Sequence, residues 1–504
     1  MGVIKKQSIK ASILTYIGFC LGAVNLFVLY ANFFTPEQLG LTQVFVAIAT
    51  PLIALSGLGM IPLVHKFFPY YKAHLTPEQR DLFQLTVIVA IVGFSIVMLL
   101  VFLNQDFIYR KFGKSPLLVD YFYLMPILAS GMLCFSLLAS FVNNLKFTVY
   151  TAFCNQILFR VLVMAGVIMV AISWISFEWY MYLFSSLYWL ISIVLIWKLW
   201  KEKALVFPGK WSRLTKRLKN SLIQFAGFYA FVRIFGSLSL FVDVIAVAGL
   251  QGLAQTAYFT VAIYFISVIA VPQKALINIS IPVISDAWRR NDLKEIQTIY
   301  QKSSTVLLIV GGVLFLLFWW NMGEFLSFMP ENYAVVAKVF LILGIAQLID
   351  MVSGVNVQVL ANSKKYWKVN VISNALLVLV LIPLNLFLIN AYGIVGAAYA
   401  RLIGLGLFNL FRGYYLYWHE GLRPFSKRIL WLIALISVNV IAAYFVNAQL
   451  DVRDMGLLQT TLLICLKSTA FLLINLPLIY HLKLSMDINQ MIDQGLVKIK
   501  LKRE

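Results

Sequence analysis

The sequence predicts an all-α, polytopic membrane protein with about 14 transmembrane helices, arranged as two six-helix lobes plus two extra C-terminal helices. Three observations predict this fold class. Of the 504 residues, 62% are hydrophobic and only 12% are charged, whereas a soluble domain carries roughly a quarter charged residues. The apolar residues form runs of about 20, the length at which a helix crosses the hydrocarbon core. The basic residues lie mostly in the short segments between these runs.

The apolar runs place the spans near 11–34, 39–64, 84–103, 123–144, 156–174, 180–198, 222–249, 256–286, 304–321, 338–361, 369–390, 393–417, 429–447 and 459–482. If the amino terminus and every second loop face the cytoplasm, those segments hold 30 of the 41 Lys and Arg residues and the opposite loops hold four. Cytoplasmic loops are enriched in Lys and Arg, so both termini are predicted to be cytoplasmic. An odd number of spans would scramble this alternation, which favours fourteen.

Several other classes of protein are not predicted. The net charge of +21 lies in short clusters between apolar runs, not along one soluble face, so we expect no nucleic acid partner. The four cysteines and four histidines do not cluster, and we expect no disulfide, metal site or cofactor. No phosphate-cradling GxxxxGK[ST] motif occurs. The longest extracytoplasmic loop, 104–122, is too short for a catalytic domain, so we do not expect an enzyme.

Internal similarity predicts how the spans are grouped. SILTYIGF (12–19) resembles SLIQFAGF (221–228), and NNLKFTVYTAFCNQ (143–156) resembles ANSKKYWKVNVISNA (361–375), at offsets of 209 to 219 residues. We therefore expect a six-helix lobe at 1–200, a basic cytoplasmic linker at 201–221, a second six-helix lobe at 222–418, helices 13 and 14 at 419–482 and a cytoplasmic tail at 483–504. Two repeats of six spans have the same orientation, which predicts substrate binding between them. The basic linker fits attraction to anionic lipid or a joint between moving halves.

Three stretches resemble Wzx-type oligosaccharide flippases of the multidrug/oligosaccharidyl-lipid/polysaccharide (MOP) superfamily. They are the first span running into FTPEQLGLTQVFVAIATPLIALSGLGM (34–60), ANSKKYWKVNVISN (361–374) and AYGIVGAAYARLIGLGLFNLF (391–411), whose small-residue turn is the most specific. The resemblance implies a bacterial inner-membrane protein that moves an undecaprenyl-pyrophosphate-linked oligosaccharide to the periplasmic leaflet for O-antigen, capsule or exopolysaccharide assembly. It also implies membrane lipid, an H+ or Na+ counter-ion and polysaccharide polymerase machinery as partners.

The alternative is a multidrug or toxin exporter of the same superfamily. Such pumps carry organic cations and need buried acid, but the first six spans here contain no carboxylate. The lipid II flippase is also similar, although that family has arginines in its first span. Residues 11–34 contain no charge, which argues against the lipid II flippase family.

Ionisable side chains inside spans are the candidate transport residues, because each costs about 2.5–3.5 kcal/mol on insertion scales. Counting about 1.5 Å per residue from the predicted span starts puts Arg233, Asp350 and Arg401 nearest the midplane. Arg matches phosphate with a planar fork of donors. We therefore expect Arg233, with Arg401, to bind the pyrophosphate, unless Arg233 forms a structural pair with Asp350 or Asp243.

The remaining candidates concern gating and coupling. Lys274 follows Pro272, which should kink the eighth span, so Lys274 is a candidate substrate contact at a gate or a snorkelling lysine. Asp243 and Asp350 are the carboxylates well inside spans, as ion-coupling residues or as counter-ions for Arg233 or Arg401.

Two further arginines, Arg160 and Arg412, lie near the predicted cytoplasmic ends of their spans. We expect their side chains to snorkel toward the interface.

Overall fold

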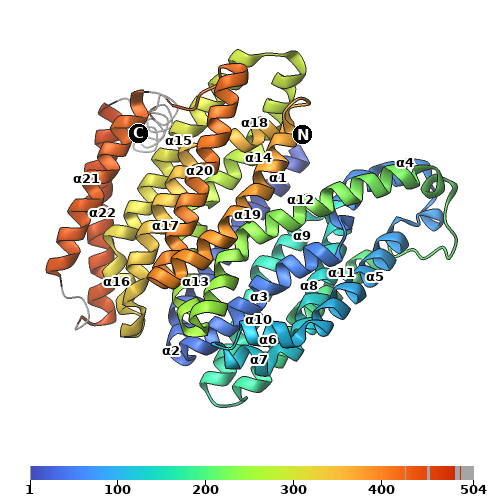
Figure 1. Ribbon diagram of the computed structural model, residues 1–504, viewed down its shortest axis with the longest axis horizontal. Helices are drawn as coiled ribbons and strands as arrows, with labels where there is room; N and C mark the ends of the chain where they lie inside the picture. Colours follow the sequence, from blue (N-terminus) through green and yellow to red (C-terminus); the bar gives the residue numbers. More distant parts are fainter. Residues whose placement is uncertain (1, 426, 451–454, 483–488, 490–504) are drawn as a thin grey trace, which may run out of the picture. The chain divides into compact units, whose positions relative to one another are not determined.

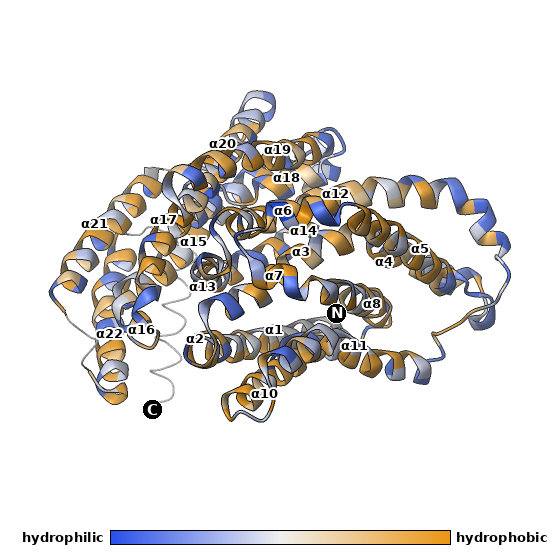
Figure 2. Ribbon diagram, turned by 60° about the horizontal axis from the view of Figure 1, so that its bottom comes forward, coloured by the Kyte–Doolittle hydropathy of each residue, from blue (hydrophilic) through white to orange (hydrophobic). Residues whose placement is uncertain are grey.

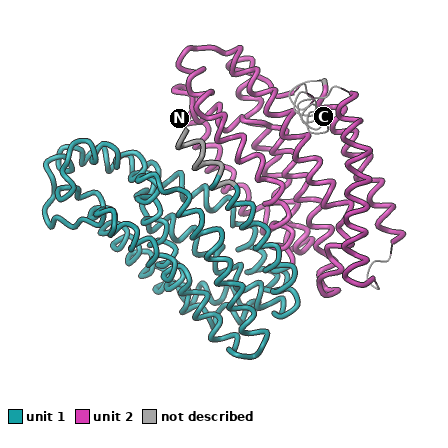
Figure 3. The backbone as a smooth tube through the Cα atoms, turned by 180° about the vertical axis from the view of Figure 1, so that it is seen from behind, with its two compact units in different colours: residues 1–257 teal, residues 258–504 magenta. Residues whose placement is uncertain are grey.

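The structure of the protein is a computed structural model that describes residues 2–425, 427–450, 455–482 and 489 (Figure 1). Every regular element within these residues is a helix, which confirms the all-α prediction. The chain divides into two compact units, residues 1–257 and 258–504, coloured separately in Figure 3. Apart from residue 489, the predicted tail at 483–504 lies outside the described residues.

Unit 1 contains the first seven spans and the start of the eighth. Its elements are α1 (Gly2–Ala23), η1 (Val24–Tyr30), α2 (Ala31–Phe33), α3 (Pro36–Ser56), α4 (Met60–His74), η2 (Pro77–Gln79), α5 (Leu82–Leu103), α6 (Gln105–Lys111), α7 (Pro116–Tyr121), η3 (Phe122–Leu124), α8 (Met125–Asn144), α9 (Thr148–Phe153), η4 (Cys154–Leu158), α10 (Phe159–Ala171), α11 (Phe177–Lys201) and α12 (Arg213–Gln251). The unit boundary falls within α13 (Leu253–Ile269).

Unit 2 contains the later spans. Its elements are α14 (Val271–Arg290), α15 (Leu293–Trp320), α16 (Met322–Ser327), η5 (Glu331–Ala334), α17 (Val335–Val352), α18 (Asn356–Asn362), α19 (Trp367–Tyr392), α20 (Ile394–Glu420), α21 (Lys427–Gln449) and α22 (Leu457–His481).

The number of spans agrees with the prediction. Among the described residues, thirteen helices are long and apolar enough to cross a bilayer, and the bent pair α13 and α14 supplies a fourteenth. Figure 2 shows apolar residues along the lengths of these helices and many of the hydrophilic residues near their ends and in the connecting loops. Large apolar side chains such as Phe102 and Trp174 are more than two-thirds exposed. A protein with this much outward apolar surface is a multi-pass membrane protein, because only lipid solvates such a surface favourably.

The second span is broken, and the continuous helix predicted at 39–64 was wrong. α3 ends at Ser56, and α4 begins at Met60 after Leu58 (φ +43°) and Gly59 (φ +74°). A Cβ on Gly59 would lie 2.2 Å from the carbonyl oxygen of Ala226 on α12. Hydropathy alone does not show such a break, because it depends on a neighbouring helix that approaches too closely for a side chain.

The kink predicted in the eighth span is confirmed. α13 and α14 are bent by 45° at Ala270, and Pro272 lies in the first turn of α14, where its missing N–H removes no helical hydrogen bond. The breaks at Gly59 and Ala270 are 211 residues apart, within the offset of 209 to 219 residues between the similar segments of the two halves.

The twelfth span begins at the small-residue turn that carries the strongest resemblance. α19 ends at Tyr392, and Gly393 has φ +61°, which favours glycine. A Cβ on Gly396 would lie 1.9 Å from the carbonyl oxygen of Leu388. The tight turn predicted between these two spans is therefore present, and both glycines are required by its geometry.

The predicted linker at 201–221 is partly helical and is fixed within unit 1. α12 has 39 residues and a length of about 58 Å, almost twice the hydrocarbon thickness. Asp81, fully buried at the start of α5, accepts hydrogen bonds from the Ser212 N–H (2.8 Å), the Ser212 hydroxyl (3.0 Å) and the Thr215 hydroxyl (2.9 Å). Because Ser212 also caps α12, this cluster joins the first turn of α12 to α5.

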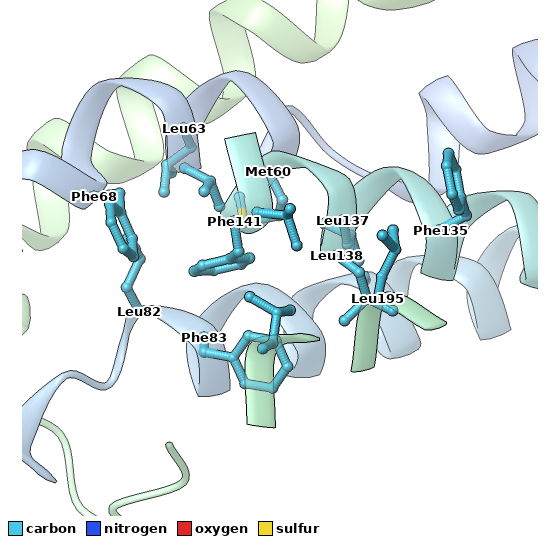
Figure 4. Close-up of a cluster of buried hydrophobic side chains, with 14 of the residues drawn as sticks. Met60, Leu63, Phe68, Leu82, Phe83, Phe135, Leu137, Leu138, Phe141 and Leu195 are labelled. Atoms are coloured by element: carbon cyan, nitrogen blue, oxygen red, sulfur yellow. The ribbon is translucent and has the colours of Figure 1, made fainter. Parts of the chain in front are cut away.

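The core of unit 1 lies between α4, α5, α8 and α11 (Figure 4). Phe141 is central, with ring centroids 5.1 Å from Phe83 and 5.8 Å from Phe68, both edge to face. Leu82, Leu138 and Leu195 belong to the same buried cluster. Aromatic pairs at this distance and angle add about 0.5–1.5 kcal/mol each to the burial of their surface.

Two spans of unit 1 contain π-helical turns. η1 continues α1, and η4 precedes α10, and each π segment packs against the helix of the other span. The Asn25 side-chain amide in η1 donates a hydrogen bond to the carbonyl oxygen of Arg160 (3.0 Å), two residues after η4. π turns are rare in proteins and tend to occur at functional sites.

Helices 13 and 14 of the prediction, α21 and α22, are fixed to unit 2 by a buried polar cluster. The Lys467 amine forms an ion pair with Glu324 and donates to the Asn447 side-chain oxygen (2.8 Å) and to the Trp320 carbonyl oxygen (3.2 Å). Glu324 is fully buried, and Lys467 is 8% exposed.

Candidate ion-coupling site

Asp350 lies at a helix break in the tenth span. α17 ends at Val352 and α18 begins at Asn356, so the continuous helix predicted at 338–361 was wrong. Gly354 has φ +57°, and a Cβ there would lie 2.8 Å from the Ser303 hydroxyl oxygen. Asp350 is two residues from the C-terminal end of α17, the negative end of its dipole. The ends of broken helices coordinate cations in several transporter folds.

Two amide side chains hold the Asp350 carboxylate. Gln273 on α14 donates to one oxygen at 2.8 Å, and Asn409 on α20 donates to the other at 2.9 Å. Two more amides support the first two: Gln347 donates to the Gln273 oxygen at 2.8 Å, and Asn356 donates to the Asn409 oxygen at 3.0 Å. This amide cluster therefore joins α14, α17, α18 and α20.

The hydrogen bonds of the amide cluster all run toward Asp350. An ionised carboxylate accepts without donating, so this direction suits the charged form. Gln273, Asn356 and Asn409 are at most 8% exposed, and Asp350 itself is half-buried. Neutralising Asp350 by a proton or a metal cation would change which amides donate to it, and so would act on four helices at once.

Arg412 on α20 is a positive charge that acts on Asp350, the role expected of Arg233 or Arg401. It is 4% exposed and interacts electrostatically with Asp350. Its guanidinium donates to the Ser373 hydroxyl and to the Asn374 side-chain oxygen on α19, both at 3.0 Å. The expectation that Arg412 snorkels was wrong, because inward hydrogen-bond partners hold the side chain within unit 2.

The other two candidates in unit 2 lie on the same helices as the amide cluster. Lys274 follows Gln273 in the first turn of α14 and is exposed. Arg401 is half-buried on α20, eight residues before Asn409 and so about 12 Å from it along the helix. Asp350 therefore contacts Gln273, the residue next to Lys274. Arg401 lies more than two helical turns from Asn409, the residue of α20 that contacts Asp350.

Arg233 lies near the middle of α12, 20 residues after Arg213 and 18 before Gln251. It is exposed on α12, and its charge acts on His65 of α4. Burial is the larger cause that lowers the pKa of His65, and the positive charge of Arg233 lowers it further. His65 hydrogen-bonds Asn144, the last residue of α8 (3.1 Å). α12 starts at Arg213, nine residues before the predicted start of this span at 222, and the depth of Arg233 in the membrane stays a prediction.

Asp243 lies near the middle of the helix pair formed by α3 and α12. Near one end of this pair, a Cβ on Gly40 would lie 2.0 Å from the carbonyl oxygen of Leu253, the first residue of α13. Near the other end, a Cβ on Gly59, just before α4, would lie 2.2 Å from the Ala226 carbonyl oxygen. Asp243 is fully buried between these contacts. It is ten residues, about 15 Å, from Arg233 on the same helix, so the two side chains cannot form the structural pair.

Sequence reasoning identified Asp350 but not the residues that hold it. The amides Gln273, Asn356 and Asn409 that form the site are uncharged, whereas the transport residues predicted from the sequence were all charged; Arg412 was expected only to snorkel. Uncharged amides in apolar runs are a weaker signal, but burying one without partners is also costly. The sequence signal for the cluster is the presence of Gln and Asn residues in the predicted eighth, tenth and twelfth spans.

Comparison with known proteins identifies the fold. No family model and no curated protein sequence matches the chain. The lipid II flippase MurJ, in an inward closed conformation, has a TM-score of 0.65 and 17% identity over 92% of this chain and 98% of that one. An inward-facing multidrug resistance MATE family transporter of the MOP superfamily has a TM-score of 0.63 and 13% identity over 86% and 98%. The fold is that of MurJ and MATE transporters.

Proposed function

We propose that the protein is a flippase that moves an undecaprenyl-pyrophosphate-linked oligosaccharide from the cytoplasmic to the periplasmic leaflet of a bacterial inner membrane. The observation that carries this proposal is the distribution of charge within the spans. Arg233 and Lys274 are exposed, whereas Asp243 is fully buried and Asp350 is held by amides. Exposed cations within the spans suit a diphosphate, because Arg and Lys bind phosphate oxygens.

Two further observations support a lipid-linked sugar. The fold is shared with a protein named as a lipid II flippase. The turn at Gly393 and Gly396, which carries the resemblance to Wzx-type flippases, has the backbone geometry that requires its glycines. The flipped product would supply polymerase machinery that builds an O-antigen, capsule or exopolysaccharide.

The second candidate is a multidrug exporter, because the MATE transporter has the same fold. Export of an organic cation needs a carboxylate that the cargo can reach. Asp243 is fully buried and both oxygens of Asp350 accept hydrogen bonds from amides, which favours the anionic substrate.

Asp350 is the proposed site at which H+ or Na+ binding drives the cycle. Neutralising its charge weakens both hydrogen bonds from Gln273 and Asn409, because bonds to a charged acceptor are about twice as strong as those between neutral groups. Gln273 lies in the first turn after the 45° bend between α13 and α14. Loss of its bond to Asp350 therefore acts directly at the bend.

Asp350→Asn tests this coupling. If Asp350 couples an ion, the variant is expected to fold at normal abundance while transport loses its dependence on the ion gradient. If Asp350 only balances Arg412, the variant is expected to lose abundance, because it leaves a buried cation unpaired. Asp286→Asn, which removes an exposed ion pair with Arg289, is the matched control. Normal abundance with gradient-dependent transport in Asp350→Asn would rule out both roles.

Arg233 is the proposed pyrophosphate contact, with Arg401 as the second. Arg233→Ala is expected to abolish polymer export at unchanged protein level. Arg233→Lys separates the alternatives, since a bidentate contact is lost with Lys whereas a simple positive field tolerates it. Arg217 is exposed near the start of the same helix. Arg217→Ala is therefore the control and should leave export intact. Wild-type export by Arg233→Ala would defeat the proposal, and a collapse in protein level would indicate a structural role.

A further inference from the structure

Unit 2 contains a cavity of about 680 Å³ between α15, α17, α20 and the segment 421–425. α20 contributes one face of it, with Gly406, Asn409, Gly413 and Tyr417 spaced three or four residues apart. These residues extend over about 16 Å of the helix. Two glycines in this row leave a groove along α20, which we call the α20 groove. Its other lining residues are Tyr300, Ile349, Val352, Ser353, Leu410, Tyr414, Arg423, Pro424 and Phe425.

One end of the α20 groove carries a positive charge. Arg423 is exposed just after α20, and its backbone is held by Gln297 through two hydrogen bonds, of 2.9 Å and 2.8 Å. Its guanidinium forms no ion pair with any residue that the structure describes. A fixed backbone with a free guanidinium at the mouth of a groove is suited to an anionic group.

Deeper in the groove, a single hydroxyl has no partner. Tyr300 is fully buried, and its hydroxyl makes no hydrogen bond within the described part of the chain. A Cβ on Gly413 would lie 3.9 Å from that oxygen, so Tyr300 lies opposite the gap that Gly413 leaves. A buried hydroxyl left unpaired costs about 1–3 kcal/mol, which a ligand with an acceptor would recover.

The remaining polar groups deep in the groove already have partners. Asn409 donates to Asp350 and accepts from Asn356, and the Ser353 hydroxyl donates to the Ile349 carbonyl oxygen (2.9 Å). The other deep walls are apolar. Tyr414 and Tyr417 are more than half exposed at the rim, as aromatic residues at a membrane interface are.

We infer that the α20 groove binds one glycerophospholipid with an anionic headgroup. The phosphate binds Arg423, an ester carbonyl accepts a hydrogen bond from the Tyr300 hydroxyl, and an acyl chain lies along Gly413 and Gly406 toward Ile349. Arg423 lies at the end of the bundle that the basic loops predict to be cytoplasmic, where the leaflet surface is negative. This site is independent of the substrate proposed above.

Native mass spectrometry of the full chain in detergent, titrated with phosphatidylglycerol and with phosphatidylcholine, tests the headgroup contact. Arg423→Gln should weaken binding of phosphatidylglycerol about five-fold, the effect of one basic residue near an anionic surface, and leave phosphatidylcholine unchanged. Arg428→Gln, an exposed arginine outside the groove, is the control. Equal effects of the two substitutions would overturn the assignment of Arg423.

The chain contact is tested separately. Gly413→Leu fills the groove and should abolish tight binding of both lipids, and Tyr300→Phe should weaken both equally. Because Tyr300→Phe removes an unpaired hydroxyl, the lipid-free protein should be no less stable. If Gly413→Leu does not fold, Tyr417→Cys on a cysteine-free background serves instead: phosphatidylglycerol should slow its reaction with a lipid-soluble maleimide at least five-fold.

Three results would overturn the proposal. The first is unchanged lipid binding in a folded Gly413→Leu variant, or unchanged labelling of Tyr417→Cys. The second is full displacement of phosphatidylglycerol by inorganic phosphate, which would make the site one for a free anion. The third is displacement by undecaprenyl phosphate at equal concentration, which would make the groove part of the substrate path.

Discussion

Lys467→Met removes the cation from the buried pair that fixes α22 to α16. Met keeps an unbranched side chain of similar length, so little packing is lost. It leaves the Glu324 carboxylate buried without its partner, and the Asn447 side-chain oxygen and the Trp320 carbonyl oxygen without a donor. We therefore expect a large loss of stability from this single substitution.

The expected loss is about 3–5 kcal/mol, the range for breaking a buried pair by removal of one partner. Glu324 is fully buried, and its second oxygen has no hydrogen-bond partner within the described residues, so solvent cannot compensate. This loss raises the unfolded fraction by about two to three and a half orders of magnitude. The double variant Glu324→Gln with Lys467→Met removes both charges and should recover about half of the loss.

Denaturant unfolding of the purified protein in detergent micelles, followed by tryptophan fluorescence, measures these differences as a double-mutant cycle. Lys365→Met is the matched control. Lys365 pairs with Glu420 at 3.6 Å but is 71% exposed, and its loss should have no measurable effect on stability. The reasoning is refuted if Lys467→Met unfolds within about 1 kcal/mol of the wild type, or if the double variant is as unstable as the single one.

Two further predictions concern the broken helix and the topology. Gly59→Ala should destabilise the protein by at least about 2 kcal/mol, because φ is +74° and the new Cβ would overlap the Ala226 carbonyl oxygen. Gly227→Ala, where nothing lies within 4 Å, should be neutral or stabilising in the same unfolding assay, and equal effects would exclude the strained break. Single cysteines in loops 198–221 and 287–303 should resist an impermeant maleimide in intact spheroplasts, while those in 104–122 and 323–337 should react; labelling of 198–221 would reverse the orientation.

The number of spans was predictable from the sequence because crossing a bilayer is a one-dimensional requirement on apolar length. The kink at Pro272 was also predictable, since the cause lies in the residue itself. The breaks at Gly59 and Gly354 were not. Each follows from an approach of another segment so close that a Cβ would overlap it, and no local pattern records which segment will approach.

The candidate site was likewise only partly predictable from the sequence. Asp350 was found because a charge inside a span is costly whatever surrounds it. Its binding partners were not found, because Gln273 and Asn409 gain their role only when α14, α17 and α20 meet. The depth of Arg233 stays a prediction, because α12 starts nine residues before the predicted span and the first apolar residue of a span does not mark the membrane surface.

The π turns of the first and fifth spans, Val24–Tyr30 and Cys154–Leu158, affect how this chain aligns with its relatives. A π turn holds about one residue more than the α turn it replaces. Each segment is thus equivalent to the insertion of one residue into a helix that still crosses the membrane. A relative whose first span is a regular α-helix aligns with this one only through a gap inside the span, where alignments rarely allow one. Two chains can therefore share this fold and still differ in residue spacing within their best-defined helices.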